Sequence, residues 1–180
     1  MKTTSATAAA IALLLAPAVG WAQAHQPYSG LETRSIKALS DQQVADLKAG
    51  RGMGLALAAE LNGYPGPVHV LELAAPLQLT EAQHERMTAL LEAMKAETVP
   101  LGEKLIAAEA DLDRQFAGRS ITETSLQEGV QEIAAAQAAL RAAHLKVHLA
   151  TIEVLTPEQV ARYAELRGYT GSKAGPHHHP

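Results

Sequence analysis

Side chains suited to a buried helix face recur every three or four residues along two long stretches of this chain. The first stretch covers residues 80–116. Its stripe positions are Met87, Leu91, Met94, Thr98, Leu101, Leu105, Ala108, Leu112 and Phe116. This spacing predicts a single long helix with one inward face. Pro100 lies inside it, and because proline lacks a backbone N–H, we expect a kink near residues 96–100.

The second stretch follows Gly118 and extends to about residue 154. Its stripe positions are Leu126, Val130, Ile133, Gln137, Leu140, His144, Val147, Thr151 and Val154. Residues 120–123, Ser-Ile-Thr-Glu, read as a capping box that starts this helix. Two long helices joined by a short turn form an antiparallel hairpin, so the expected fold class is all-α. Because long helices alone bury little, we also expect an antiparallel homodimer shaped as a cradle.

Shorter elements flank the expected hairpin. Helical patterns cover residues 40–48, 68–75 and 157–167, and residues 55–61 are apolar and rich in alanine. Glycines at 50, 52 and 54 and the sequence Tyr-Pro-Gly-Pro at 64–67 interrupt the chain. We therefore divide it into a leader (1–24), an N-terminal arm with short helices (25–67), a helical domain (68–168) and a flexible tail (169–180).

One short motif occurs twice, and each copy is predicted to start a helix. The shared residues are Leu79, Thr80, Gln83 and Arg86 in the first copy and Leu155, Thr156, Gln159 and Arg162 in the second. Threonine at an N-cap accepts a hydrogen bond from a backbone N–H, and the glutamine three residues later bonds back to the N–H of the cap. A weaker third copy at 39–43 keeps only part of this pattern. Any helical protein needs caps, but two copies that share four residues are harder to explain by capping alone.

These copies of Leu-Thr-x-x-Gln resemble the repeat of the Spy/CpxP family of periplasmic proteins. The resemblance covers roughly residues 71–167. It implies an ATP-independent chaperone or envelope-stress regulator that holds unfolded clients on a concave face. A related branch of periplasmic heavy-metal sensors is similar in build.

Residues 1–24 have the features of a cleavable secretory signal. Lys2 supplies the basic start, a short apolar run follows, and Ala22, Gln23 and Ala24 form a small-x-small cleavage site. The apolar run is too short to span a bilayer. We therefore expect a periplasmic protein whose mature chain has no membrane span.

Composition narrows the possible functions. The 15 basic residues less Lys2, against 19 acidic ones, leave the mature chain a net charge of −5, which argues against a nucleic-acid partner. The absence of cysteine excludes thiol chemistry and a disulfide framework. The chain contains no nucleophile elbow, zinc-protease motif or cofactor fingerprint, so we expect neither an enzyme nor a required cofactor.

Some histidines suggest a transition metal such as zinc, copper or nickel. His144 and His148 are one helical turn apart, the spacing by which two imidazoles share an ion, although His144 also fits as a hydrogen-bonded core residue. His69 and Glu72 are three residues apart, and the resemblance to the sensor branch adds them as possible ligands, with a solvated pair as the alternative. The chain ends offer further candidates, His177, His178 and His179 in the tail and a mature N-terminus at His25.

Client binding requires an adaptable apolar surface. Met53, Met87, Met94 and Leu101 are the candidates because methionine repacks easily, and the alternative is that they belong to the core. The leading hypothesis is therefore a periplasmic chaperone or stress protein that binds unfolded or envelope proteins. The alternatives are a periplasmic metal sensor or buffer, and a structural module that binds an envelope partner.

Overall fold

The computed structural model describes residues 27–170 of this 180-residue chain. Both the expected leader, residues 1–24, and the histidines of the tail lie outside this range. Within it the protein is all-helical, as the sequence predicts, with six α-helices, one short 3₁₀-helix η1 (Leu31–Thr33) and no strand beyond a single bridge. No helix in the described range is both long enough and apolar enough to cross a membrane.

The two longest helices, α4 (Glu81–Ala117) and α5 (Glu123–Ile152), pack side by side as the expected antiparallel hairpin. Gly118 caps the end of α4, as predicted. The start of α5 differs from the prediction, because the N-cap is Thr122 paired with Ser125, and not Ser120 with Glu123. Both pairs of side chains are able to cap a helix, and in the structure the later pair, Thr122 and Ser125, does so.

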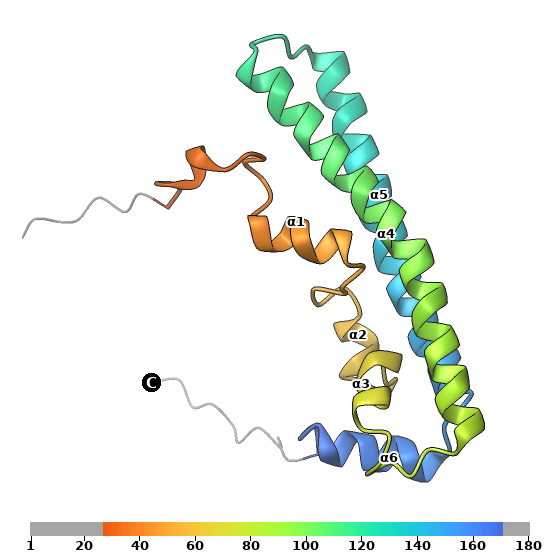
Figure 1. Ribbon diagram of the computed structural model, residues 1–180. Coiled ribbons are helices and arrows are strands. Elements are labelled where there is room, and N and C mark those ends of the chain that lie inside the picture. The colour runs from red at the N-terminus through yellow and green to blue at the C-terminus, as the bar shows by residue number, and fades with distance from the viewer. Residues whose placement is uncertain (1–26, 171–180) are drawn as a thin grey trace, which may run out of the picture.

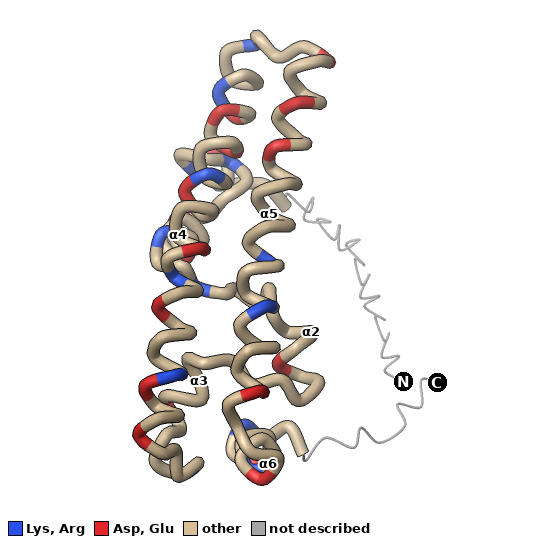
Figure 2. Tube along the Cα trace, turned by 90° about the vertical axis from the view of Figure 1, so that its right-hand side faces the viewer, with Lys and Arg blue, Asp and Glu red and all other residues tan. Residues whose placement is uncertain are grey.

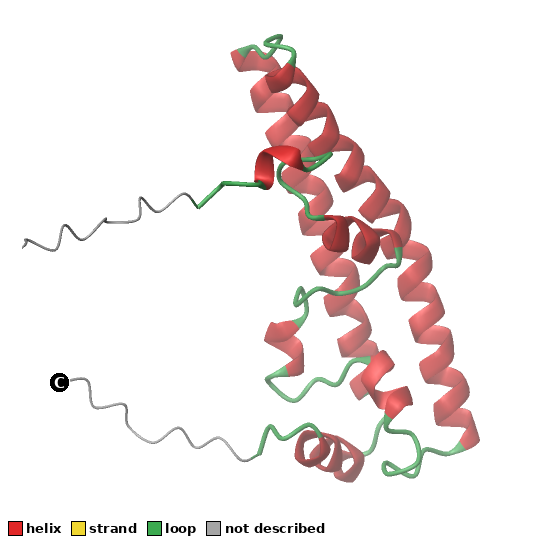
Figure 3. Ribbon diagram, turned by 60° about the vertical axis from the view of Figure 1, so that its left-hand side comes forward, coloured by secondary structure: helices red, strands yellow, loops and turns green. Residues whose placement is uncertain are grey.

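Helix α4 continues through Pro100 as one element. The hairpin is gently bowed, and the short helices α1, α2 and α3 lie on its concave side (Figure 1). They are α1 (Asp41–Lys48), α2 (Leu57–Glu60) and α3 (Pro67–Glu72). Helix α6 (Pro157–Leu166) lies across the base of the hairpin (Figure 1), and Figure 3 shows the described residues as helices joined by loops. The sequence predicts most of these short elements, but α2 and α3 are shorter than their apolar patterns.

The core has two parts along the hairpin. The upper cluster joins α1 to the hairpin and contains Leu47, Leu105, Ala108, Ile133, Ala136 and Leu140. The lower cluster joins α3 and α6 to the base and contains Val70, Leu77, Met87, Leu90, Leu155 and Tyr163. Gly102 allows α1 to approach α4, because a Cβ there would lie 2.5 Å from the carbonyl oxygen of Leu47. The N-terminal segment is therefore an integral part of the packed structure.

Charged residues of both signs are interspersed along α4 (Figure 2). Two exposed ion pairs link the long helices, Lys146 with Glu97 at 3.2 Å and Lys104 with Glu132 at 3.8 Å. Exposed pairs of this kind contribute about 0–1 kcal/mol each. The hairpin is therefore held mainly by its apolar face.

Candidate functional site

The two motif copies, far apart in sequence, meet at the base of the hairpin. The side-chain amide of Gln83 donates to Oε1 of Gln159 at 2.8 Å, and that of Gln159 donates to Oε1 of Gln83 at 3.0 Å. Their remaining N–H groups donate to the backbone carbonyls of Val154 and Leu77, at 2.9 and 3.2 Å. We call this reciprocal pair the glutamine junction.

Both glutamines also cap their own helices. Oε1 of Gln83 accepts from the backbone N–H of Thr80 at 3.1 Å, and Oε1 of Gln159 accepts from that of Thr156 at 3.0 Å. Each threonine hydroxyl accepts a bond from the backbone N–H of its glutamine in return. Local capping, which the sequence predicts, thus orients both amides for a long-range contact that it does not.

The other shared motif residues have separate roles. Leu155 is buried, and Leu79 packs against the same lower cluster. Arg86 and Arg162 are exposed, and Arg162 pairs only with Glu165, at 2.9 Å on its own helix. The third copy forms a capping box at Ser40 and Gln43 but makes no contact with the junction.

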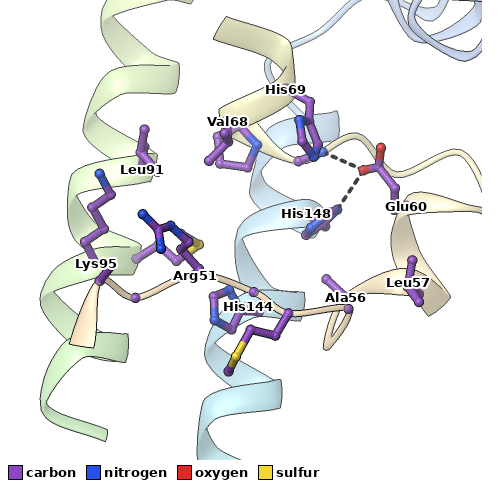
Figure 4. A pocket seen from close by; sticks show the side chains of 18 residues that line it. Arg51, Ala56, Leu57, Glu60, Val68, His69, Leu91, Lys95, His144 and His148 are labelled. Carbon is purple, nitrogen blue, oxygen red and sulfur yellow. Dashed lines mark hydrogen bonds and ion pairs between the residues drawn. The ribbon is translucent and has the colours of Figure 1, made fainter. Parts of the chain in front are cut away.

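A pocket of about 530 Å³ lies between the N-terminal segment and the concave side of the hairpin. Its walls are residues 49–54, Ala56, Leu57, Glu60, residues 66–69, Leu91, Met94, Lys95, His144 and His148. Figure 4 shows Arg51 and Lys95 on one side of this pocket and Glu60 and Leu57 on the opposite side. We call this cavity the hairpin pocket.

The structure brings three of the four predicted metal ligands to this pocket. His144, His148 and His69 line it, whereas Glu72 does not. The Nδ1–H group of His148 donates to the carbonyl of Tyr64 at 2.7 Å, which leaves Nε2 as its ligand atom. His69 pairs with Glu72 at 2.9 Å. Within residues 27–170 no group of three or more possible ligands is arranged around a common point.

His144 is the least satisfied of these histidines. Its side chain is buried, and its Nε2 has no hydrogen-bond partner among the described residues. Burial lowers the pKa of His144 below the ordinary value of 6.5, and the neighbouring His148 acts in the same direction. The hydroxyls of Thr98 and Thr151 are likewise buried without a partner in this part of the chain.

Glu60 forms a polar network that the sequence analysis missed. Its buried carboxylate accepts hydrogen bonds from the hydroxyls of Tyr163 and Tyr169, the latter at 2.9 Å, and from the backbone N–H of Gly66 at 3.2 Å. Its Oε2 lies 3.9 Å from Nδ1 of His148. Burial and the adjacent Glu60 raise the pKa of Tyr163. An acidic residue in an alanine-rich helix gave no sequence signal for this contact.

The residues predicted to bind clients differ in their exposure. Met87 and Met94 are buried, because they belong to the inward face of α4, and Leu101 is half-buried against the upper cluster. Only Met53 exposes much of its surface. Its backbone has a φ of 43°, in the left-handed region that non-glycine residues rarely adopt. It also lines the hairpin pocket.

Comparison with known proteins gives one match. The model of a family described as LTXXQ motif family protein matches residues 69–167, more than half of the chain. This range includes both copies of the motif and begins after α2. No curated protein and no solved structure matches the chain.

Proposed function

Because this chain belongs to the LTXXQ motif family, the family of Spy/CpxP-like proteins, we propose that it is an ATP-independent chaperone or envelope-stress protein. The family is periplasmic in general, which agrees with the secretory signal expected at residues 1–24. It is also not an enzyme family in general, and the proposed activity is reversible binding without catalysis. The clients are unfolded or partner proteins of the envelope.

One observation carries this proposal furthest. Among the described residues, ten large hydrophobic side chains are exposed, and five of them fall between positions 53 and 68. They are Met53, Leu57, Leu61, Tyr64 and Val68. Exposed apolar side chains gathered in one segment are typical of surfaces that bind other proteins. We call these five residues the apolar rim, and we assign client contacts to them in place of Met87 and Met94.

The experiment is an aggregation assay on protein expressed as the full chain and recovered from the periplasm. Thermally unfolded citrate synthase serves as the client, and no nucleotide is added. We expect suppression of light scattering at near-stoichiometric protein. The double variant Leu57→Ser/Leu61→Ser should weaken it several-fold, because it removes two exposed contacts without disturbing the core.

The matched control is Phe116→Ser at the hairpin tip, where the side chain is 53% exposed. It should retain suppression. If the wild-type protein fails to suppress aggregation, or if Phe116→Ser is impaired while the rim variant is not, the assignment to the rim is wrong. Light scattering of the protein without client gives its molar mass. This measurement tests the antiparallel homodimer that we also propose.

A transition-metal sensor or buffer is the second candidate. His144, His148 and His69 share the hairpin pocket, and the Nδ1 atoms of His148 and His69 bond to protein oxygens, as in histidines that ligate a metal through Nε2. Titration with zinc, copper and nickel tests this alternative. Binding that is lost in His144→Ala would favour it over the chaperone.

A further inference from the structure

The hairpin pocket has features of a small-molecule site that neither the family match nor the proposed chaperone activity explains. Its volume of about 530 Å³ falls within the roughly 300–1,000 Å³ of ligand pockets. Apolar side chains such as Val68, Leu91 and Met94 form much of its wall. Ligand sites are commonly apolar, with a few convergent polar groups that set specificity.

The ionisable groups of the pocket are almost all cationic or potentially cationic. They are Arg51, Lys95, His69, His144 and His148, and the single acidic group is Glu60. The Glu60 carboxylate already accepts three hydrogen bonds, from two tyrosines and a backbone N–H. Asp46, outside the lining, pairs with Arg51 at 2.6 Å, so among the described residues the positive charge of the lining that has no acidic partner is that of Lys95. The pocket therefore favours an anion.

Two cations are available for that anion. Lys95 has no hydrogen bond or ion pair recorded within the described residues. Arg51 uses one N–H group for Asp46, at 2.6 Å, and a guanidinium has four more to donate. Both lie on the side of the pocket opposite Glu60 (Figure 4). A carboxylate head there lies away from Glu60, the one acidic residue of the lining, while Asp46 occupies one side of the Arg51 guanidinium.

The wall contributed by residues 50–54 gives a second, independent indication. Gly50, Met53 and Gly54 all have positive φ, and Met53 is strained there because it carries a Cβ. Backbone strain gathers at ligand-binding sites. The buried Nε2 of His144, under the same loop, has no partner in the described chain.

We propose that the hairpin pocket binds a small amphipathic carboxylate, with the head group at Arg51 and Lys95 and an apolar tail along Val68, Leu91 and Met94. The apolar rim residues Met53, Leu57 and Val68 also border this cavity. The site does not depend on the proposed chaperone activity. Ligand binding and client binding are therefore separate measurements.

The test is a calorimetric titration of the periplasmic protein with octanoate, below the concentration at which it forms micelles. Acetate supplies the head group alone and 1-octanol the tail alone. We expect saturable 1:1 binding of octanoate that is clearly tighter than that of either fragment. Lys95→Ala should weaken octanoate binding about fivefold, the size of a partly exposed charge pair, and leave 1-octanol unchanged.

Lys104→Ala is the matched control, because Lys104 is an exposed lysine of the same helix outside the pocket. It should bind octanoate as the wild type does. Leu91→Trp, which fills the pocket, should abolish binding, and circular dichroism verifies that each variant folds. Equal affinities for octanoate and 1-octanol, or equal effects of Lys95→Ala and Lys104→Ala, would overturn the proposal. The proposal would also be overturned if the protein bound no octanoate while its client binding depended on Lys95.

Discussion

Two polar regions of this protein, one half-buried and one buried, are built in opposite ways. At the glutamine junction, the amides of Gln83 and Gln159 use every N–H group and both oxygens in hydrogen bonds. Elsewhere along the two long helices, three buried polar atoms, Oγ1 of Thr98, Nε2 of His144 and Oγ1 of Thr151, have no partner in the described chain. We call these three the unpaired set.

This difference distinguishes a region that stabilises the fold, the glutamine junction, from one that is suited to bind a ligand. A buried polar group with all its bonds made costs little and fixes one geometry, whereas an unpaired one costs roughly 1–3 kcal/mol. The junction ties α4, α6 and the turns before them into one arrangement. The unpaired set includes His144, which lines the hairpin pocket. The glutamine junction therefore stabilises the fold, whereas the hairpin pocket keeps an unpaired polar atom beside a cavity that can hold a ligand.

The largest expected effect comes from breaking the junction. Gln159→Ala removes the acceptor of the Thr156 N–H and leaves the Leu77 carbonyl and the Gln83 amide without their partner. We expect a loss of about 2 kcal/mol or more in the free energy of unfolding, measured by urea denaturation. Arg162→Ala, on the exposed face of the same helix, is the control and should change it by less than about 0.5 kcal/mol. If Gln159→Ala and Arg162→Ala lowered the free energy of unfolding equally, the hydrogen bonds of the junction would contribute no more than an exposed side chain of the motif.

A smaller effect of opposite sign is expected at the unpaired set. Thr98→Val keeps the shape of the side chain and removes a buried hydroxyl without a partner. The free energy of unfolding should rise by about 1 kcal/mol, because the desolvation cost of that hydroxyl disappears. Thr88→Val on the same helix is the control, since the Thr88 hydroxyl donates to the carbonyl of His84 at 3.0 Å. A loss of stability in Thr98→Val would show that its hydroxyl is satisfied in solution.

The smallest effect is a pH dependence from His144. Its pKa is lowered in the folded state, so the unfolded chain binds a proton more readily, and stability falls as the pH drops below about 6.5. The loss levels off once the pH is below the folded-state pKa. The other ionisable side chains that line the same pocket are those of Arg51, Lys95, His69, His148 and Glu60.

Urea denaturation between pH 7.5 and pH 5 measures this dependence. The His144→Leu variant should lose less stability than the wild type over the same range. His84→Leu, at an exposed histidine of α4, is the control and should follow the wild type. If His144→Leu also follows it, the dependence arises elsewhere.

The sequence predicted the helices better than their contacts. The stripes of 80–116 and 120–154 located both long helices, and the motif located the caps at Thr80 and Thr156. The predicted metal pair, His144 and His148, does line one cavity. Its surroundings were not predictable, because Tyr64, which accepts the hydrogen bond of His148, and Gly52, which lies against the ring of His144, belong to the distant N-terminal segment.

Two further features could not be predicted for the same reason, namely the burial of Met87 and Met94 and the contacts of Glu60. Met87 and Met94 were assigned to a client surface because their flexibility suits one, but helix periodicity cannot tell which stripe remains open when other helices pack on it. Glu60 gave no signal, since its partners Tyr163 and Tyr169 are about one hundred residues further on.

By itself, the sequence determined most of what depends on neighbours within about four residues, the cap of α5 at Thr122 being an exception. Helix periods, capping boxes and the break at Gly118 are local, because helical and capping hydrogen bonds join residues three or four apart. Only the tertiary structure decided which amides pair, which apolar residues are covered and where a cavity remains. Those outcomes depend on how α1, α2, α3 and α6 pack against the hairpin, and that packing is set by the shape and burial of residues distant in the chain.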